Sequence, residues 1–100
     1  MKKISEILRG LREKKEMSAE QVARMCQISA QEYMWFENAA PAPNKPTKEQ
    51  LEKLSDVFNI PFHVLYFLSI EEEDVPPSKR DAFKKIQPNI YKLIEQIFLT

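Results

Sequence analysis

Glycine, cysteine and histidine are almost absent from this chain of 100 residues, which contains one of each. Tight hairpin turns and strand bulges depend on glycine, so its scarcity disfavours strand-rich folds and favours helices. A single cysteine cannot form an internal disulfide, and a single histidine cannot by itself build a zinc site. We therefore expect no metal and no cofactor, and the cysteine usage predicts a reducing, cytoplasmic location.

Long apolar runs and an excess of either charge are also missing. The longest apolar run spans five residues, 64–68, which predicts neither a transmembrane helix nor a signal peptide, and hence no membrane partner. Fifteen basic residues balance fifteen acidic ones, which excludes a protein that binds polyanions through bulk charge alone. A chain of 100 residues forms one small domain at most, too short for a barrel or a doubly wound enzyme.

Three capping boxes, each a hydroxyl side chain followed three residues later by Glu or Gln, are the first positive signal. They begin at Ser18, Ser29 and Thr47, and each predicts the start of a helix. Together with apolar residues at three- and four-residue spacing, they predict an all-α fold with five helices in its first part. The expected ranges are 2–15, a short helix from 19, 30–38, 48–58 and 62–68.

The connections between these helices also carry information. Gln27 and Ile28 separate the second and third helices, which is typical of a helix-turn-helix. Pro41, Pro43 and Pro46 forbid continued helix and predict an extended connector over 39–46.

The composition changes near residue 70, where an acidic run over 71–74 and two following prolines interrupt the apolar periodicity. We expect a bundle over 1–70, an acidic, proline-containing linker over 71–78 and a C-terminal helix over 79–100. Ser78 with Asp81 is the expected cap of that helix, and Pro88 predicts a kink or a restart. An apolar stripe along it must pack either back on the bundle or on a second copy. The residues expected to mediate a dimer are Ile86, Ile90, Leu93, Ile94 and Ile97.

Three stretches carry a shared set of spaced motifs: residues 11–23, 28–38 and 46–61. Together they resemble the Cro/C1-type helix-turn-helix family, also called the xenobiotic response element family, and the resemblance covers residues 4–68. It implies a five-helix, lambda-repressor-like bundle whose third helix enters the major groove of double-stranded DNA while the start of the second faces a phosphate.

The resemblance also implies roles for individual residues. Arg12 and Glu37 match positions that form a structural ion pair, which suits the planar fork of arginine. Tyr33 and Phe36 match core positions, and the amide of Gln31 can both donate to and accept from adenine. The residues expected to face DNA are Ser18, Ser29, Ala30, Gln31, Met34, Trp35 and Lys45.

Several residues depart from the family pattern. Ala19 replaces a glutamine that the family often has, and Gln27 stands where the turn often has glycine. No Lys or Arg lies between Arg24 and Lys45, so phosphate contacts from this stretch have few cationic donors. Trp35 has three interpretations: it packs on thymine methyls or the sugar backbone, it forms a protein interface, or it folds over into the core.

These features predict a sequence-specific DNA-binding transcriptional regulator, a repressor that acts as a homodimer. The alternative is a helix-turn-helix used as a protein-interaction module, antitoxin-like or anti-repressor, that contacts a protein partner through Met34, Trp35 and the apolar tail. Enzymatic activity is not expected, because Cys26 and His63 are isolated candidates in apolar helices rather than members of a catalytic group.

Overall fold

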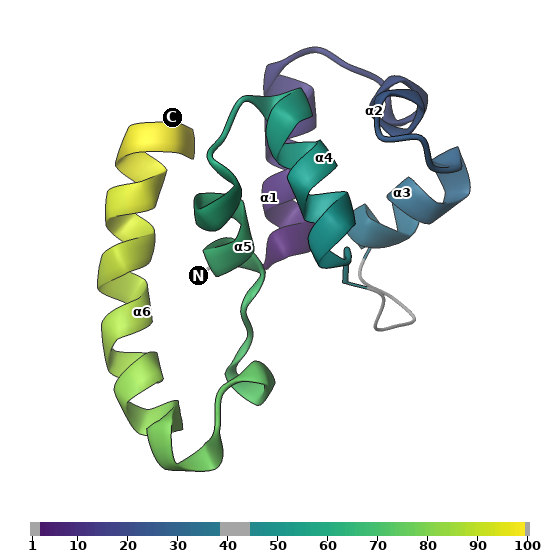
Figure 1. Cartoon of the computed structure of the whole chain (residues 1–100). Helices are drawn as coiled ribbons and strands as arrows, with labels where there is room; N and C mark the ends of the chain where they lie inside the picture. The colour runs from purple at the N-terminus through teal and green to yellow at the C-terminus, as the bar shows by residue number, and fades with distance from the viewer. Residues whose placement is uncertain (1–2, 39–44, 100) are drawn as a thin grey trace.

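The computed structural model describes residues 3–38 and 45–99, and within these ranges every regular element is a helix (Figure 1). This confirms the predicted all-α, lambda-repressor-like class. The expectation for Pro41 and Pro43 lies outside the described residues. The α-helices are α1 (Ile4–Lys14), α2 (Ala19–Met25), α3 (Ala30–Asn38), α4 (Lys48–Phe58), α5 (Phe62–Ser69) and α6 (Arg80–Ile94). Shorter 3-10 turns span Glu72–Asp74 and Pro77–Lys79, and a π-helical turn spans Glu95–Leu99.

The core is built by helices α1 to α5, and α6 adds Tyr91 and Ile94 to it. Apolar side chains recur there at helical spacing, so each helix buries one face against its neighbours. Leu8, Val22, Cys26, Leu54 and Leu65 are fully enclosed. Helix α3 packs against both α1 and α2, and Figure 1 shows α2 and α3 on one side of α1 and α4, with α6 on the other.

Two of the three capping boxes form completely. Ser18 and Thr47 each accept a hydrogen bond from the backbone N–H three residues ahead, and the glutamine at that position accepts one from the cap residue's own N–H. At Ser29 the structure shows the first of these bonds, from the N–H of Glu32 at 3.0 Å. The carboxylate of Glu32 instead accepts a hydrogen bond from Gln50 Nε2 at 3.3 Å, so it faces α4.

Helix α6 corrects two expectations, one at Pro88 and one at its start. It runs through Pro88 as one helix, so the restart is wrong, whereas the kink stays a prediction. The expected serine cap is wrong: no side chain caps the start of α6, because Ser78 lies inside a 3-10 turn that leads directly into Arg80.

The C-terminal segment packs back on the bundle with one of its faces. Tyr91 and Ile94 are buried members of the core, and Phe98 and Leu99 are partly buried against it. The neighbouring face of the same helix is exposed to solvent. Packing back on the bundle and pairing with a second copy are therefore compatible, because they use different faces of one helix. The large apolar side chains on the exposed face are Ile86, Ile90, Leu93 and Ile97.

Candidate nucleic-acid interface

The turn between α2 and α3 is built around a strained residue. Gln27 has φ of 60°, in the left-handed region that side chains other than glycine adopt at a cost. The N–H of Ile28 bonds the carbonyl of Ala23 at 3.0 Å, which closes the end of α2. Lys53 Nζ donates to Gln27 Oε1 at 3.2 Å, so a side chain of α4 is hydrogen-bonded to the turn. This sets the angle at which α3 leaves the turn.

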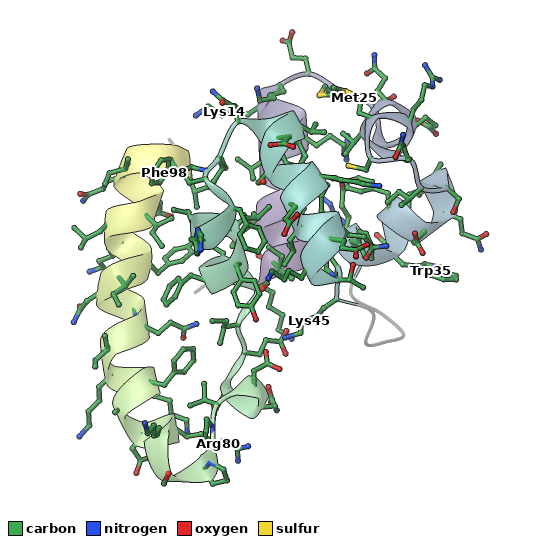
Figure 2. The ribbon with its side chains drawn as sticks, viewed as in Figure 1. Lys14, Met25, Trp35, Lys45, Arg80 and Phe98 are labelled. Carbon is green, nitrogen blue, oxygen red and sulfur yellow. The ribbon has the colours of Figure 1, made fainter. Side chains whose placement is uncertain are left out.

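The outward face of α3 presents three side chains that sequence analysis placed on DNA. Gln31 is exposed, and Met34 and Trp35 are exposed to 45% and 46%. In a helix, residues three and four apart lie on one face, so these three form one surface. Figure 2 shows Trp35 pointing away from the bundle, so its indole does not fold into the core. Ala30 is half-buried at the start of the helix.

The opposite face of α3 is locked to α1. Arg12 donates from Nε to Glu37 Oε2 at 2.7 Å and from its terminal nitrogen to Glu37 Oε1 at 3.0 Å, a bidentate pair. A second terminal nitrogen of Arg12 donates to the carbonyl of Met17 at 3.0 Å. Arg9 lies 3.6 Å from the same carboxylate and donates to the side-chain oxygen of Asn38 at 3.3 Å. These contacts fix the orientation of α3 without using its outward face.

The environment of this carboxylate shows which charge state the fold requires. Burial is the largest single influence on the pKa of Glu37 and would raise it, but hydrogen bonding and the positive charges of Arg12 and Arg9 together outweigh burial and hold the pKa below its ordinary value. The neighbouring Tyr33 has its pKa raised, first by burial and then by the nearby Glu37 carboxylate. Glu37 is therefore ionised in the folded state, and Tyr33 is neutral.

Lys45 is engaged within the protein. Its Nζ donates to the carboxylate of Asp74 and, at 3.1 Å, to the carbonyl of Ser69. Asp74 has its pKa lowered by a backbone hydrogen bond from Glu71 and by the bond from Lys45. This ion pair ties the segment before α4 to the acidic segment that leads to α6. Ser18, also placed on DNA by sequence analysis, uses its hydroxyl to cap α2.

Sequence reasoning missed two contributors to this region. Arg9 precedes Arg12 by three residues, so the helical spacing that puts both on one face of α1 could have identified it. The partner of Lys45 lies 29 residues away, in a segment read as a solvated linker. No local pattern connects such distant positions, so only the structure reveals this pair.

Residues 3–38 and 45–99 provide neither a metal-binding cluster nor a membrane-spanning helix. These residues contain no cluster of His, Cys, Asp or Glu able to hold a metal ion. No helix among them is long and apolar enough to cross a membrane.

A family model described as Helix-turn-helix matches residues 8–65, more than half of the chain, from within α1 to within α5. No curated protein and no solved structure matches the chain.

Proposed function

The chain belongs to the Cro/C1-type helix-turn-helix family of DNA-binding regulators, and from this premise we propose that it is a sequence-specific transcriptional repressor. In this proposal it binds double-stranded DNA as a homodimer, with α3 of each copy in a major groove. The division of the chain into a DNA-binding bundle over 1–70, a linker over 71–78 and a dimerisation helix over 79–100 belongs to the same proposal.

The outward face of α3 is the observation that carries the proposal. The helix has one face buried against α1 and α2 and locked by the Arg12–Glu37 pair, and its other face presents an amide and two large apolar side chains to solvent. A rigidly held helix with base-reading groups on its free side is what insertion into a groove requires. Gln31 is the proposed direct reader, and Ser29 and Ala30 lie at the end that approaches the bases.

Backbone donors supplement the few cations near this face. The start of α2 is capped by Ser18 and has Ala19 as its first residue, so its free N–H groups and its helix dipole are available to a phosphate. Repression then follows from occupancy, because a protein bound in the groove excludes other proteins from the same sites.

A second copy of this chain is the proposed partner of the exposed face of α6. Ile86, Ile90, Leu93 and Ile97 follow one another at intervals of four, three and four residues, the spacing of a seam between paired helices. Their side chains carry no hydrogen-bonding groups, so the matching surface must be apolar too. A two-fold axis through this seam would also give two α3 helices for a palindromic site. Ile94 lies outside the seam, since it is buried in the core.

The dimer is tested by Leu93→Asp and Ile97→Asp, with Lys92→Asp as the control on the same helix. Leu93 and Ile97 are both exposed, so replacing either of them should leave the bundle folded. The expected result is a dimer mass for the parent chain and the control, and a monomer mass for the two seam variants, by light scattering. An unchanged mass for both seam variants would refute the seam.

DNA binding is tested by selecting bound sequences from a random duplex library and measuring affinity for the selected duplex at several salt concentrations. We expect a palindrome whose affinity falls as salt rises, because each phosphate contact releases counterions. Gln31→Ala should weaken binding to the selected duplex, whereas Glu52→Ala, an exposed change on α4, should not.

One observation favours a second candidate function. The exposed face of α3 has no Lys or Arg and presents Met34 and Trp35, side chains that also suit a protein interface. In that case the family fold serves as a protein-interaction module. The library separates the two functions, since no enriched sequence at low salt would favour the protein-interaction module.

A further inference from the structure

We infer that α3 reads thymine methyl groups through Met34 and Trp35, so that the half-site bound by each copy is rich in A·T pairs. The inference rests on the proposed function, since it names the class of DNA that the same face would select. It depends on which chemical groups α3 leaves free to meet a base.

Guanine is excluded first. Its strongest contact is a bidentate one from Arg or Lys, and the sequence has neither between Arg24 and Lys45. Two lysines of neighbouring segments are already engaged, Lys45 with Asp74 and Lys53 with Gln27. The reading face therefore offers no cationic fork to guanine.

Cytosine is disfavoured on similar grounds. Its exposed amino group is read best by a carboxylate acceptor, and the only acidic side chain in the first two turns of α3 is Glu32. That carboxylate is half-buried and accepts a hydrogen bond from Gln50 on α4. At the far end of α3, the side-chain oxygen of Asn38 is taken by Arg9.

Adenine and thymine match the side chains that remain free on the outward face of α3. Gln31 is exposed and has no hydrogen-bonding partner among the described contacts of α3, so its amide can pair with adenine. Met34 and Trp35 lie one turn further on the same face, and apolar side chains distinguish thymine from the other bases by its methyl group. From Gln31 to Trp35 the helix rises about 6 Å, which spans roughly two base-pair steps.

The experiment compares thymine with deoxyuridine, which pairs identically and lacks only the methyl group. In the selected duplex, each thymine of one half-site is replaced in turn, and affinity is measured by anisotropy of a labelled duplex. Burial of one methyl group corresponds to about a fourfold change in affinity, so we expect a loss of that size at one or two positions.

The protein variants identify the side chains responsible. In Trp35→Ala and Met34→Ala the deoxyuridine penalty should disappear at the position that each side chain contacts, although overall affinity also falls. Both side chains are exposed, so the variants keep the fold, which far-UV circular dichroism verifies. Met25→Ala is the matched control, because Met25 is an exposed methionine on α2 that Figure 2 places well away from Trp35. The deoxyuridine penalty of the Met25→Ala variant should equal that of the parent chain.

Two results would overturn the inference and leave the proposed function intact. One is selection of a G·C-rich half-site, and the other is a deoxyuridine penalty that is absent in the parent chain or unchanged in both α3 variants. Failure to select any duplex would instead overturn the proposed function together with the inference.

Discussion

The two sides of the bundle are held by different forces. On the α3 side, a buried carboxylate meets two arginines of α1 above a continuous apolar core. On the α6 side, Tyr91 and Ile94 dock one end of the helix, and the Lys84–Glu72 ion pair at the other end lies in solvent. Buried pairs resist salt and tolerate no loss of a partner, whereas exposed pairs contribute little. Helix α3 is thus fixed more firmly than α6, the helix that carries the proposed dimer seam.

The largest expected effect comes from breaking the buried pair. Glu37→Ala leaves the guanidinium of Arg12 without its bidentate partner, and we expect the free energy of unfolding to fall by about 3 kcal/mol. Urea denaturation followed by far-UV circular dichroism measures this. Glu13→Ala, an exposed change on α1, is the control and should be close to neutral. Equal effects of the two variants would mean that the Arg12–Glu37 pair stabilises the α3 side no more than an exposed carboxylate does.

Next in size is the apolar anchor of the other side. Ile94→Ala removes a buried side chain between α6 and the bundle, and we expect a loss of about 2 kcal/mol. Ile97→Ala, on the exposed face of the same segment, should cost far less in the monomeric background of Leu93→Asp. Hydrogen exchange should show faster opening of α6 in Ile94→Ala with little change in α3. Equal acceleration in both helices would show that they unfold as one unit.

Acidification should weaken the α3 side reversibly. The pKa of Glu37 is lower in the folded than in the unfolded chain, so its contribution is fully present above the ordinary value of 4.5 and is lost as pH falls below it through the folded pKa. Urea midpoints between pH 7 and pH 3 should therefore fall less steeply in Glu37→Gln than in the parent chain. Parallel profiles for the two proteins would contradict this assignment.

A smaller, stabilising change is expected where the two sides meet. Gly10 lies inside α1, beside a small cavity of about 100 Å³ that Tyr91 and Leu99 also line. An added Cβ would meet no heavy atom within 4 Å, so Gly10→Ala should raise the free energy of unfolding by about 1 kcal/mol through helix propensity. Thermal unfolding measures the gain. A loss instead would indicate that the end of α6 moves closer to α1 in solution.

The smallest effect is expected at the exposed end of α6. Lys84 lies 2.9 Å from Glu72, with both side chains about half exposed. Solvent screens such a pair, so Lys84→Gln should leave the urea midpoint unchanged within error, both in low salt and in about 0.5 M salt. At the higher salt concentration, dissolved ions screen charges that lie more than a few ångström apart. A clear salt-dependent loss would show that ion pairs also hold this side.

Local signals predicted the fold well, and non-local contacts account for most of what they missed. The boxes at Ser18 and Thr47 gave the starts of α2 and α4, because the groups that cap a helix are its own neighbours in sequence. At Ser29 the box is incomplete, because Gln50 competes for the Glu32 carboxylate from another helix.

The same distinction applies to the candidate surfaces. The apolar spacing over 79–100 indicated a helix with a stripe, but could not divide that stripe into a face on the bundle and a face in solvent. That division depends on where the preceding turn directs α6, and the acidic segment that sets this direction is anchored by Lys45, which is remote in sequence.

The position of Trp35 gives the protein a built-in optical probe of one surface. It is the only tryptophan in the chain, and its indole is 46% exposed while folded. Its emission should already resemble that of an indole in water, so unfolding will shift it little, and stability is better followed by circular dichroism. Anything that covers the outer face of α3 will, by contrast, exclude water from the indole and change its fluorescence directly. The tryptophan fluorescence of unlabelled protein can therefore report the occupancy of this face, because no other residue of the chain contributes to that signal.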